Sequence, residues 1–360
     1  MTQKPRFAIN GYGRIGRSSL RVWLSRFSTE ADLVAINTSG SLNMAGIAHL
    51  TKYDTSYRIL SNQISFEEVS TPDKLTDDNP LLGYLTIDDF RIPVLGQRDP
   101  LKIPWKKYSP DVIIEATGAF RSQADAQKHL TAGARGVVIS APPKDATPTA
   151  IIGVNEDKLF KGDRSSRMTV VSNASCTTNS VAPVADVIHK HLGVRKAMLT
   201  TVHGYTDDQN LQDNSHKDLR RARAAAQNIV PTSTGAAIST TEAVPDLKGL
   251  FDGIALRVPV ITGSITDFTF VTEKTTSVSE VNEILTEASR LPQYQGILAV
   301  TSDPIVSSDI IGRPESSIVD LDLTRVVDGD LVKILAWYDN EWGYTNRLVE
   351  QTLKLAENLH

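Results

Sequence analysis

A glycine-rich turn near the start of the chain constrains its fold more than any other segment. The apolar run Arg6–Asn10 leads into Gly11-Tyr12-Gly13-Arg14-Ile15-Gly16, and a helical pattern continues through Leu20 and Leu24. Glycines at this spacing allow a tight turn and a close approach of the backbone to a pyrophosphate, whose charge would face the helix N-terminus. The segment favours dinucleotide binding over a plain strand–helix turn. The predicted cofactor contacts here are Gly11, Gly13, Arg14, Ile15 and Gly16.

Further apolar runs bounded by turn residues follow along the first half of the chain. Leu33–Asn37, Asp111–Gly118 and Gly136–Pro143 are such runs, and helical stretches separate them. Near-continuous apolar strands that alternate with helices are typical of a parallel sheet covered on both faces. Residues 1–175 are therefore predicted to form a Rossmann-type, doubly wound α/β domain. Its ligand would bind at the carboxyl ends of the strands, where Thr117 and Ser140 are further predicted cofactor contacts.

The second predicted strand, Leu33–Asn37, ends in Thr38-Ser39-Gly40 and not in an acid. A carboxylate at this place usually binds the ribose 2′-hydroxyl of NAD. Its absence removes a charge that would repel a 2′-phosphate, and Thr38 could donate a hydrogen bond to that phosphate or simply occupy a loop. Glu30 and Asp32 lie before the strand, at the wrong end to replace the missing acid.

The hydrophobic periodicity changes after about residue 195. Alternation in Ile265–Val271 and strands on both sides of Asp328-Gly329, a strong hairpin signal, indicate antiparallel pairing. Ser277-x-x-Glu280 is typical of a helix start. Residues 176–342 are therefore predicted to form an α+β domain with a largely antiparallel sheet. A final helix over 343–360 is expected to pack back on the first domain.

The only cysteine of the 360 residues lies in a polar stretch, Ser172-Asn173-Ala174-Ser175-Cys176-Thr177-Thr178-Asn179. The β-type run Met168–Val171 precedes it, and a helical pattern that ends at Gly193 follows. The sulfur would therefore lie at a helix N-terminus, where unpaired N–H groups favour the thiolate over the thiol. A lone cysteine is most often a small buried hydrophobe. The hydroxyl and amide neighbours argue against an apolar pocket and make Cys176 a candidate nucleophile.

His203 is the best candidate for a base to act on Cys176. It follows the strand pattern Ala197–Val202 and precedes a long polar segment, Gly204 to Asn228, whose length is typical of a functional or interface loop. The alternative is a structural or solvated histidine.

The other histidines have weaker claims to a catalytic role. His189 and His191 are two residues apart on a predicted helix, so they point in different directions and make a poor metal pair. No metal site is predicted. Four others lie in segments typical of surface or sheet packing: His49, His129, His216 and His360.

Composition limits the partners of the chain. A formal net charge of -4, with acids and bases interspersed, offers no basic face for nucleic acid or anionic lipid. No apolar run approaches the ~18 residues needed to span a bilayer. One cysteine permits no disulfide within the chain, and Met1–Pro5 leads into a strand instead of an apolar signal segment. We expect a cytoplasmic protein of about two domains that acts on a small molecule.

A thiolate, an imidazole and a nicotinamide together suit the oxidation of an aldehyde. The sulfur adds to the carbonyl to give a thiohemiacetal, whose alkoxide can expel hydride to the cofactor and leave a thioester. His203 would take the hydroxyl proton as hydride leaves. Water or phosphate could then open the thioester.

Six segments, in order and together covering essentially the whole chain, resemble the signature segments of phosphorylating glyceraldehyde-3-phosphate dehydrogenases. They are Asn10–Arg17, Ser172–Asn179, His203–Thr206, Pro231–Ala237, Leu256–Pro259 and Trp337–Tyr344. The resemblance implies oxidation of glyceraldehyde 3-phosphate to 1,3-bisphosphoglycerate with reduction of NAD(P)+, in glycolysis or gluconeogenesis. It also implies that Cys176 is the nucleophile and His203 the base of a catalytic domain over 176–342.

The resemblance further implies two anion sites around the sulfur and a homotetramer. Asn340 would orient the nicotinamide carboxamide, and the loop after His203 would line a neighbouring subunit's cofactor site. For Arg220 a solvated position or a subunit contact stays open, and for Arg223 it is preferred. The implied ligands of inorganic phosphate are Ser175, Thr177, Thr234 and Gly235. Those of the substrate phosphate are Thr206, Arg220 and Arg257.

Three positions depart from the family pattern. NAD-linked members typically carry an aspartate at the position of Thr38 and a proline at that of Ser215, which predicts use of NADP(H), alone or alongside NAD(H). Ser180 replaces a second cysteine found in many members. One alternative function is that of erythrose-4-phosphate dehydrogenase, a relative whose reaction ends in hydrolysis. The chain resembles the glyceraldehyde enzyme more, because both implied phosphate sites keep their hydroxyl side chains. A non-catalytic nucleotide- or RNA-binding regulatory protein is the other, against which the acidic balance argues.

Overall fold

The computed structural model describes residues 4–160 and 168–360, so the start of the Met1–Pro5 segment lies outside the described residues. The chain divides into two compact units. Unit 1 comprises Met1–Ala150, Asp157–Ala174 and Thr345–His360, and unit 2 comprises Ile151–Glu156 and Ser175–Tyr344. Residues 151–156, expected in the first domain, thus belong to unit 2. No helix among the described residues is long and apolar enough to cross a membrane.

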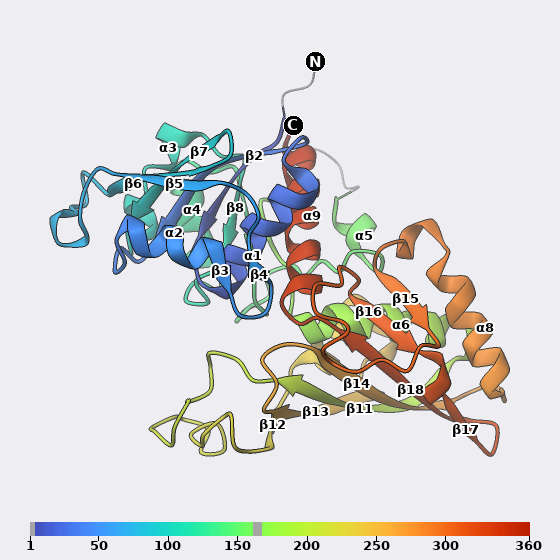
Figure 1. Cartoon of the computed structure of the whole chain (residues 1–360). Coiled ribbons are helices and arrows are strands. Elements are labelled where there is room, and N and C mark those ends of the chain that lie inside the picture. Colours follow the sequence, from blue (N-terminus) through green and yellow to red (C-terminus); the bar gives the residue numbers. More distant parts are fainter. Residues whose placement is uncertain (1–3, 161–167) are drawn as a thin grey trace. The chain divides into compact units, whose positions relative to one another are not determined.

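Unit 1 is built on a sheet with the strand order β10-β9-β8-β1-β2-β7-β6-β5 (Figure 1). The first six strands in this order are mutually parallel, as predicted for a Rossmann-type sheet. β7, β6 and β5 pair antiparallel at one edge, which the sequence analysis did not foresee. The strands are β1 Arg6–Asn10, β2 Asp32–Thr38, β5 Ile64–Glu68, β6 Leu81–Ile87, β7 Phe90–Gly96, β8 Val112–Glu115, β9 Gly136–Ile139 and β10 Val170–Ser172.

Helices lie between the strands of unit 1 along the chain, and α9 follows the last strand of unit 2. α4 begins where the Ser122 side chain accepts a hydrogen bond from the Asp125 N–H, and such a cap satisfies a donor that the first helical turn leaves free. A two-stranded ladder, β3 Tyr53–Asp54 and β4 Arg58–Ile59, follows α2. The helices are α1 Arg14–Val22, α2 Met44–Lys52, α3 Trp105–Tyr108, α4 Gln123–Thr131, α5 Glu156–Phe160 and α9 Trp342–Leu359, of which α5 and α9 cross the division between the units.

Two glycines of the turn after β1 are required by close backbone contacts. Gly11 has a φ of +96°, and a Cβ on it would lie 2.6 Å from the Thr117 nitrogen. A Cβ on Gly16 would lie 2.0 Å from the Gly11 oxygen. Any other side chain would therefore force the turn, α1 and β8 apart.

Unit 2 contains the largely antiparallel sheet that the sequence predicts, in the order β12-β13-β11-β14-β18-β16-β15, with β17 paired to β18. Only β11 with β13 and β15 with β16 run parallel. Asp328 and Gly329 have φ values of +50° and +75° in the turn between β17 and β18, so the predicted hairpin is confirmed. The strands are β11 Val194–Gly204, β12 Val230–Ser233, β13 Phe251–Val258, β14 Ser264–Thr272, β15 Leu298–Thr301, β16 Ser317–Asp320, β17 Arg325–Val327 and β18 Leu331–Tyr338.

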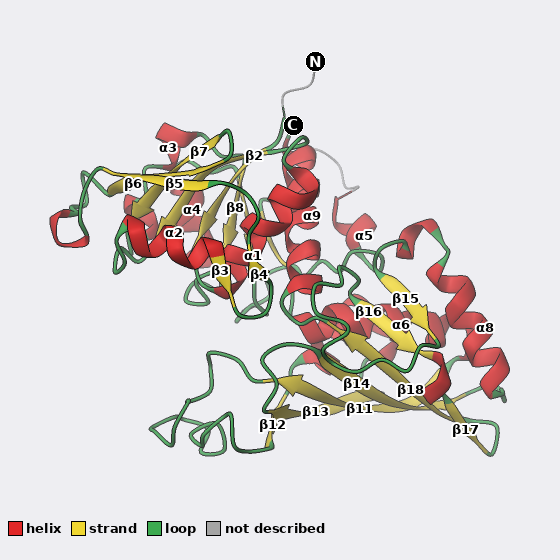
Figure 2. Ribbon diagram, in the orientation of Figure 1, coloured by secondary structure: helices red, strands yellow, loops and turns green. Residues whose placement is uncertain are grey.

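Helices cover one face of this sheet (Figure 2). They are α6 Cys176–Leu192, α7 Ala236–Ala243 and α8 Val278–Ser289, and their apolar side chains share one core with Phe268 and Phe270 of β14. Alternate residues of β14 are buried in that core. The opposite face exposes apolar side chains, including Met198 and Ile254. A hollow of about 710 Å³ is lined by Met198 and also by Ile238 and Thr241 of α7.

Candidate active site

Cys176 is the first residue of α6, and Ser175 caps that helix by accepting a hydrogen bond from the Thr178 N–H at 3.0 Å. The preceding residue, Ala174, has a φ of +54°, a left-handed conformation that costs roughly 1–2 kcal/mol for a residue with a Cβ. Strain of this kind is common at functional sites. The predicted position of the sulfur at a helix N-terminus is confirmed.

His203 lies near the end of β11, is 3% exposed, and directs its ring toward the cysteine. Its Nε2 is 3.4 Å from Cys176 Sγ, and its Nδ1 is 2.6 Å from the Gly204 carbonyl oxygen. When Nδ1 donates to that oxygen, Nε2 is free to accept a proton from sulfur. Tyr338 packs edge-on against the imidazole, with ring centroids 5.9 Å apart. The two residues therefore have the geometry of a nucleophile and its base.

Arg257 approaches the same imidazole from β13, where it is paired with His203 in the parallel ladder. Its Nη1 lies 2.5 Å from His203 Nδ1 and 3.1 Å from the Gly204 oxygen. Arg257 can donate to Nδ1 only when Nδ1 carries no proton, so it competes with the tautomer in which Nε2 is the base. An anion that drew the guanidinium away would favour that tautomer.

Burial and charge shift the pKa values of both groups. Burial, followed by the charge of Arg257, lowers the pKa of His203 to about 3, against a smaller opposing effect of the Gly204 hydrogen bond. Burial raises the pKa of the Cys176 thiol, although Arg257 and hydrogen bonds from Thr177 lower it in part. The net direction for Cys176 is opposite to that expected from the helix N-terminus alone, because loss of hydration outweighs the favourable charges. Near pH 7 both groups are therefore neutral.

The residues predicted to bind inorganic phosphate lie at two helix starts. Ser175 and Thr177 flank the sulfur at the start of α6, while Thr234 and Gly235 precede α7, which packs against α6. The Thr177 hydroxyl is buried and lies 2.9 Å from Tyr338 Oη. Free helix N–H groups attract anions.

The residues predicted for the substrate phosphate are less uniform in position. Arg257 touches His203, whereas Arg220 is exposed and lines a hollow of about 650 Å³ with Thr232 and Ser233. Thr206 is half-buried just after β11. Arg223 pairs with Asp213 on the surface at 2.9 Å. The structure thus brings one of the two predicted arginines against the catalytic pair.

Asn340 is held in one orientation by a loop of unit 2. Its Oδ1 accepts from the Gly263 N–H at 3.1 Å and from Ser264 Oγ at 2.9 Å, which leaves the NH₂ group as the donor for a ligand. Ser264 Oγ also accepts from the Gly204 N–H at 3.2 Å. Sequence reasoning missed Ser264 and Tyr338, although Tyr338 lies in the segment Trp337–Tyr344 and faces the interior in the alternation of β18.

A separate pocket of about 330 Å³ lies in unit 1 at the carboxyl ends of β1, β2 and β8. Its lining contains no charged side chain. The Thr38 hydroxyl donates to the Leu95 oxygen at 3.0 Å and accepts from the Gly40 N–H at 3.1 Å, so its hydrogen is already used. The pocket is lined by Gly11, Tyr12, Gly13, Thr38, Ser39, Ser41, Leu42, Ile47, Leu50, Ala116 and Thr117.

The other predicted cofactor contacts lie outside this lining. Arg14 forms an ion pair with Asp54, and the Ser140 N–H donates to the backbone carbonyl oxygen of Glu115 at 3.0 Å. Ile15 and Gly16 are in α1. Ser215 is exposed in the segment of unit 2 between β11 and β12 (Figure 1). Within the described part of the chain, no three His, Cys, Asp or Glu side chains are grouped so that they could hold a metal ion.

Comparison with known proteins finds relatives over nearly the full chain. Residues 5–123 match the family described as glyceraldehyde 3-phosphate dehydrogenase, NAD binding domain, and residues 175–340 match the C-terminal domain of the same family. The chain is 47% identical to glyceraldehyde-3-phosphate dehydrogenase of Streptomyces coelicolor, over 98% of this chain and 99% of the relative. It is 45% identical to chloroplastic glyceraldehyde-3-phosphate dehydrogenase A of Chlamydomonas reinhardtii, over 97% and 88%.

Proposed function

Because the chain belongs to the glyceraldehyde-3-phosphate dehydrogenase family, a family of oxidoreductases, we propose that it oxidises glyceraldehyde 3-phosphate through a covalent bond to Cys176. The product is 1,3-bisphosphoglycerate, with inorganic phosphate as the second substrate. The observation that carries this proposal is the 3.4 Å approach of Cys176 Sγ to His203 Nε2 at the start of α6.

The first step forms the carbon–sulfur bond. His203 Nε2 takes the thiol proton as the sulfur attacks the aldehyde carbon, and the Gly204 oxygen stabilises the resulting imidazolium through Nδ1–H. The imidazolium returns this proton to the carbonyl oxygen, which completes the thiohemiacetal. His203 then removes the hydroxyl proton as the hydride leaves carbon, and a thioester remains on Cys176. A bound NAD(P)+ supplies the nicotinamide that accepts the hydride.

Residues of unit 1 fit the dinucleotide that this step requires. Gly11 and Gly16 keep open a turn that any Cβ would fill. The pocket next to this turn lies at the carboxyl ends of three parallel strands. Asn340 supports the proposal from unit 2, because its NH₂ group is a donor suited to a carboxamide oxygen.

Phosphate then opens the thioester. We assign the attacking phosphate to Ser175, Thr177, Thr234 and Gly235, and the substrate's own phosphate to Thr206, Arg220 and Arg257. Support comes from the N–H groups at the starts of α6 and α7 and from the contact of Arg257 with His203. A substrate phosphate that drew Arg257 from Nδ1 would leave His203 in the tautomer needed for the base.

We also propose that NADP(H) is accepted, alone or alongside NAD(H). The pocket in unit 1 has no acid that would repel a 2′-phosphate. Thr38 contributes by being uncharged, since its hydroxyl hydrogen binds the Leu95 oxygen. Ser39 and Ser41, whose hydroxyls are 2.8 Å apart and exposed, can supply hydrogen bonds instead. Ser215 is assigned the same role in a neighbouring subunit's site.

A homotetramer and a cytoplasmic location complete the proposal. The helix-free face of the unit 2 sheet supports association, because Met198 is 55% exposed and Ile254 is 48% exposed on it. Apolar sheet faces are normally covered by another layer. A single cysteine suits a reducing compartment.

A spectrophotometric assay with both cofactors, with and without phosphate, tests the function. We expect phosphate-dependent reduction of NADP+, and Cys176→Ser should abolish it while nucleotide binding persists. A phosphate-independent rate would instead indicate hydrolysis, as in erythrose-4-phosphate dehydrogenase. A preference for NAD+ in kcat/KM above roughly a hundredfold, about 2.7 kcal/mol, would contradict the cofactor proposal. Thr38→Asp should shift selectivity toward NAD+.

A further inference from the structure

A chain of side-chain hydrogen bonds crosses four adjacent strands of the unit 1 sheet at their carboxyl ends. Glu115 ends β8, Asn10 ends β1, Asn37 lies near the end of β2 and Gln97 follows β7. Asn10 Nδ2 donates to Glu115, and Asn37 Nδ2 donates to Asn10 Oδ1 at 2.7 Å. Asn37 also exchanges two hydrogen bonds with the Gln97 backbone, at 2.8 and 3.1 Å. The four residues are at most 8% exposed, so water competes little for these bonds.

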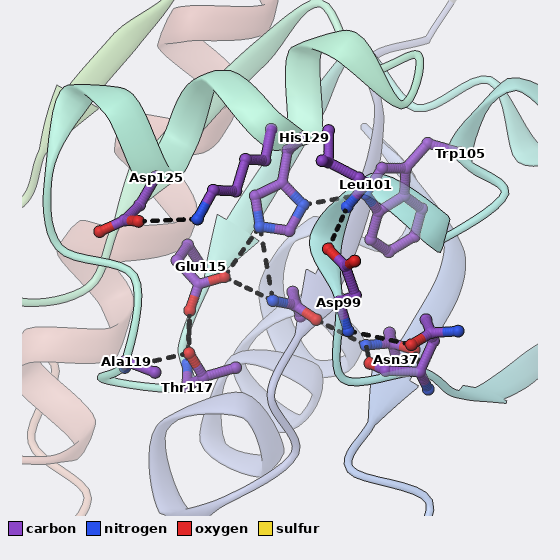
Figure 3. A network of polar contacts seen from close by, with 12 residues as sticks. Asn37, Asp99, Leu101, Trp105, Glu115, Thr117, Ala119, Asp125 and His129 are labelled. Carbon is purple, nitrogen blue, oxygen red and sulfur yellow. Dashed lines mark hydrogen bonds and ion pairs between the residues drawn. The ribbon is translucent and has the colours of Figure 1, made fainter. Parts of the chain in front are cut away.

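His129 of α4 joins this chain at Glu115, as Figure 3 shows. Trp105 Nε1 lies 3.0 Å from His129 Nδ1, and an indole N–H can only donate. Nδ1 is therefore an acceptor, which puts the ring proton on Nε2. His129 Nε2 then donates to Glu115 Oε2 at 3.0 Å. Trp105 thus fixes the tautomer of the His129 imidazole.

Four donors converge on the Glu115 carboxylate, which is 1% exposed. One oxygen accepts from the Thr117 N–H at 2.9 Å and from the Thr117 hydroxyl, and the other accepts from Asn10 and His129. A carboxylate is an acceptor at both oxygens, so every donor is satisfied. An amide in its place would direct its NH₂ at two donors whichever way it turned.

The carboxylate also holds the floor of the dinucleotide pocket. Thr117 and Ala116 line that pocket, and the Gly11 Cα rests on the peptide between them, since a Cβ there would lie 2.6 Å from the Thr117 nitrogen. Glu115 binds that same nitrogen. The hydroxyl of Thr117 is committed to Glu115 and to the Ala119 N–H, so it shapes the pocket without offering a free hydroxyl hydrogen to a ligand.

We propose that Glu115 is a positioning residue for the dinucleotide, and that His129 and Asn10 hold it in place. Glu115 fixes the Ala116–Thr117 peptide, and the glycine turn that binds the pyrophosphate rests on this peptide. The inference depends on the proposed function, because the pocket must take NAD(H) or NADP(H). It adds residues that do not touch the ligand and that act through Thr117 and Gly11.

Titration of the full chain with NAD+ and NADP+ by calorimetry tests this proposal. Glu115→Gln should weaken binding about tenfold, about 1.4 kcal/mol, and should raise KM for the cofactor while kcat at saturation stays within twofold. His129→Leu, which removes one donor to Glu115, should weaken binding severalfold. His129→Gln keeps an N–H donor and should restore most of the affinity. Asp125→Asn makes the same carboxylate-to-amide change on α4 in a residue paired with Lys128, and binding should be unchanged.

Unchanged affinity in both Glu115→Gln and His129→Leu, with only a lower thermal midpoint, would show a purely structural network and overturn the inference. If Glu115→Gln fails to fold, the His129→Leu and His129→Gln pair decides: equal affinities would overturn the inference, and recovery in the glutamine variant would support it. Wild-type protein that bound neither nucleotide would overturn the proposed cofactor and this inference together. Normal wild-type binding with unaltered variants would overturn this inference alone.

Discussion

His129 and His203 are equally buried, at 0% and 3% exposure, yet their surroundings give them opposite properties. Each nitrogen of His129 faces one partner of matching character, the Trp105 N–H and the Glu115 carboxylate. His203 has one nitrogen toward a thiol, and its other nitrogen is contested by a carbonyl oxygen and by Arg257. The comparison shows that burial alone does not make a histidine catalytic. A ring whose proton has two competing positions can transfer it, whereas a ring with matched partners is held still.

Replacing each of the two histidines in turn should produce the largest difference, and that difference is in kcat. His203→Gln should lower kcat by about a thousandfold, because the base is lost, while His129→Leu should leave kcat at saturating cofactor within twofold. Steady-state kinetics with glyceraldehyde 3-phosphate measure both. A large loss of kcat in His129→Leu, or a small one in His203→Gln, would break the distinction.

The stability of the same variants should follow the reverse order. His129→Leu leaves the Trp105 N–H without a partner and removes one of the two donors to Glu115 Oε2, which should cost about 1–3 kcal/mol in the free energy of unfolding. His203→Gln should cost less, because the Gly204 oxygen keeps its hydrogen bond from Arg257 when the imidazole is lost. Urea unfolding at pH 7 measures the difference, and equal losses would contradict it.

These contrasts were only partly accessible from the sequence. The helix start at Cys176 and the strand before His203 follow from periodicity, since the polar stretch and the apolar run are local patterns. His129 was expected to be a surface or packing residue, and it is the centre of a buried network instead. Its partners Glu115, Trp105 and Asn10 are 14, 24 and 119 residues away, so no local pattern reveals the set.

Other differences also have a tertiary origin. The antiparallel edge β7-β6-β5 carries few apolar side chains on its outermost strand, where Ser65, Phe66, Glu67 and Glu68 are exposed, so it lacks the buried-strand pattern. The direction of the Cys176 pKa could not be read from its helix position, because burial of the thiol raises the pKa and outweighs the lowering by Arg257. The glycine turn and the Asp328-Gly329 hairpin were predictable because both contain positive φ values, which glycine adopts at little cost and an Asp-Gly pair favours.

Removing the charge of Arg257 should have a smaller effect, a change in the pKa of His203. Arg257→Gln should raise the pKa of His203 from about 3, because burial is the larger cause of the lowered value and the charge of Arg257 is the second. NMR of protein labelled at the histidine ring carbons would follow His203 as the pH is lowered from 7 to the lowest pH at which the chain stays folded. An unchanged His203 titration would show that burial acts alone.

The smallest expected effect is on the pH dependence of stability. The pKa of His203 is about 3 in the folded chain and its ordinary value is 6.5, so between these values the unfolded chain binds a proton that the folded chain does not. Stability should therefore fall as pH falls from 6.5 toward 3, by at most about 1.4 kcal/mol per pH unit from this residue. His203→Gln should lose less stability than wild type over that range in urea unfolding. Parallel pH profiles would contradict the depressed pKa.

Trapping the covalent intermediate tests the central claim most directly. Wild-type protein would be mixed with glyceraldehyde 3-phosphate and NADP+ or NAD+ in the absence of phosphate, quenched in acid, digested and examined by mass spectrometry. We predict a phosphoglyceroyl thioester on the peptide that contains Cys176, and its loss on addition of phosphate before the quench. Rapid phosphate-dependent turnover with no adduct on Cys176 would contradict the account.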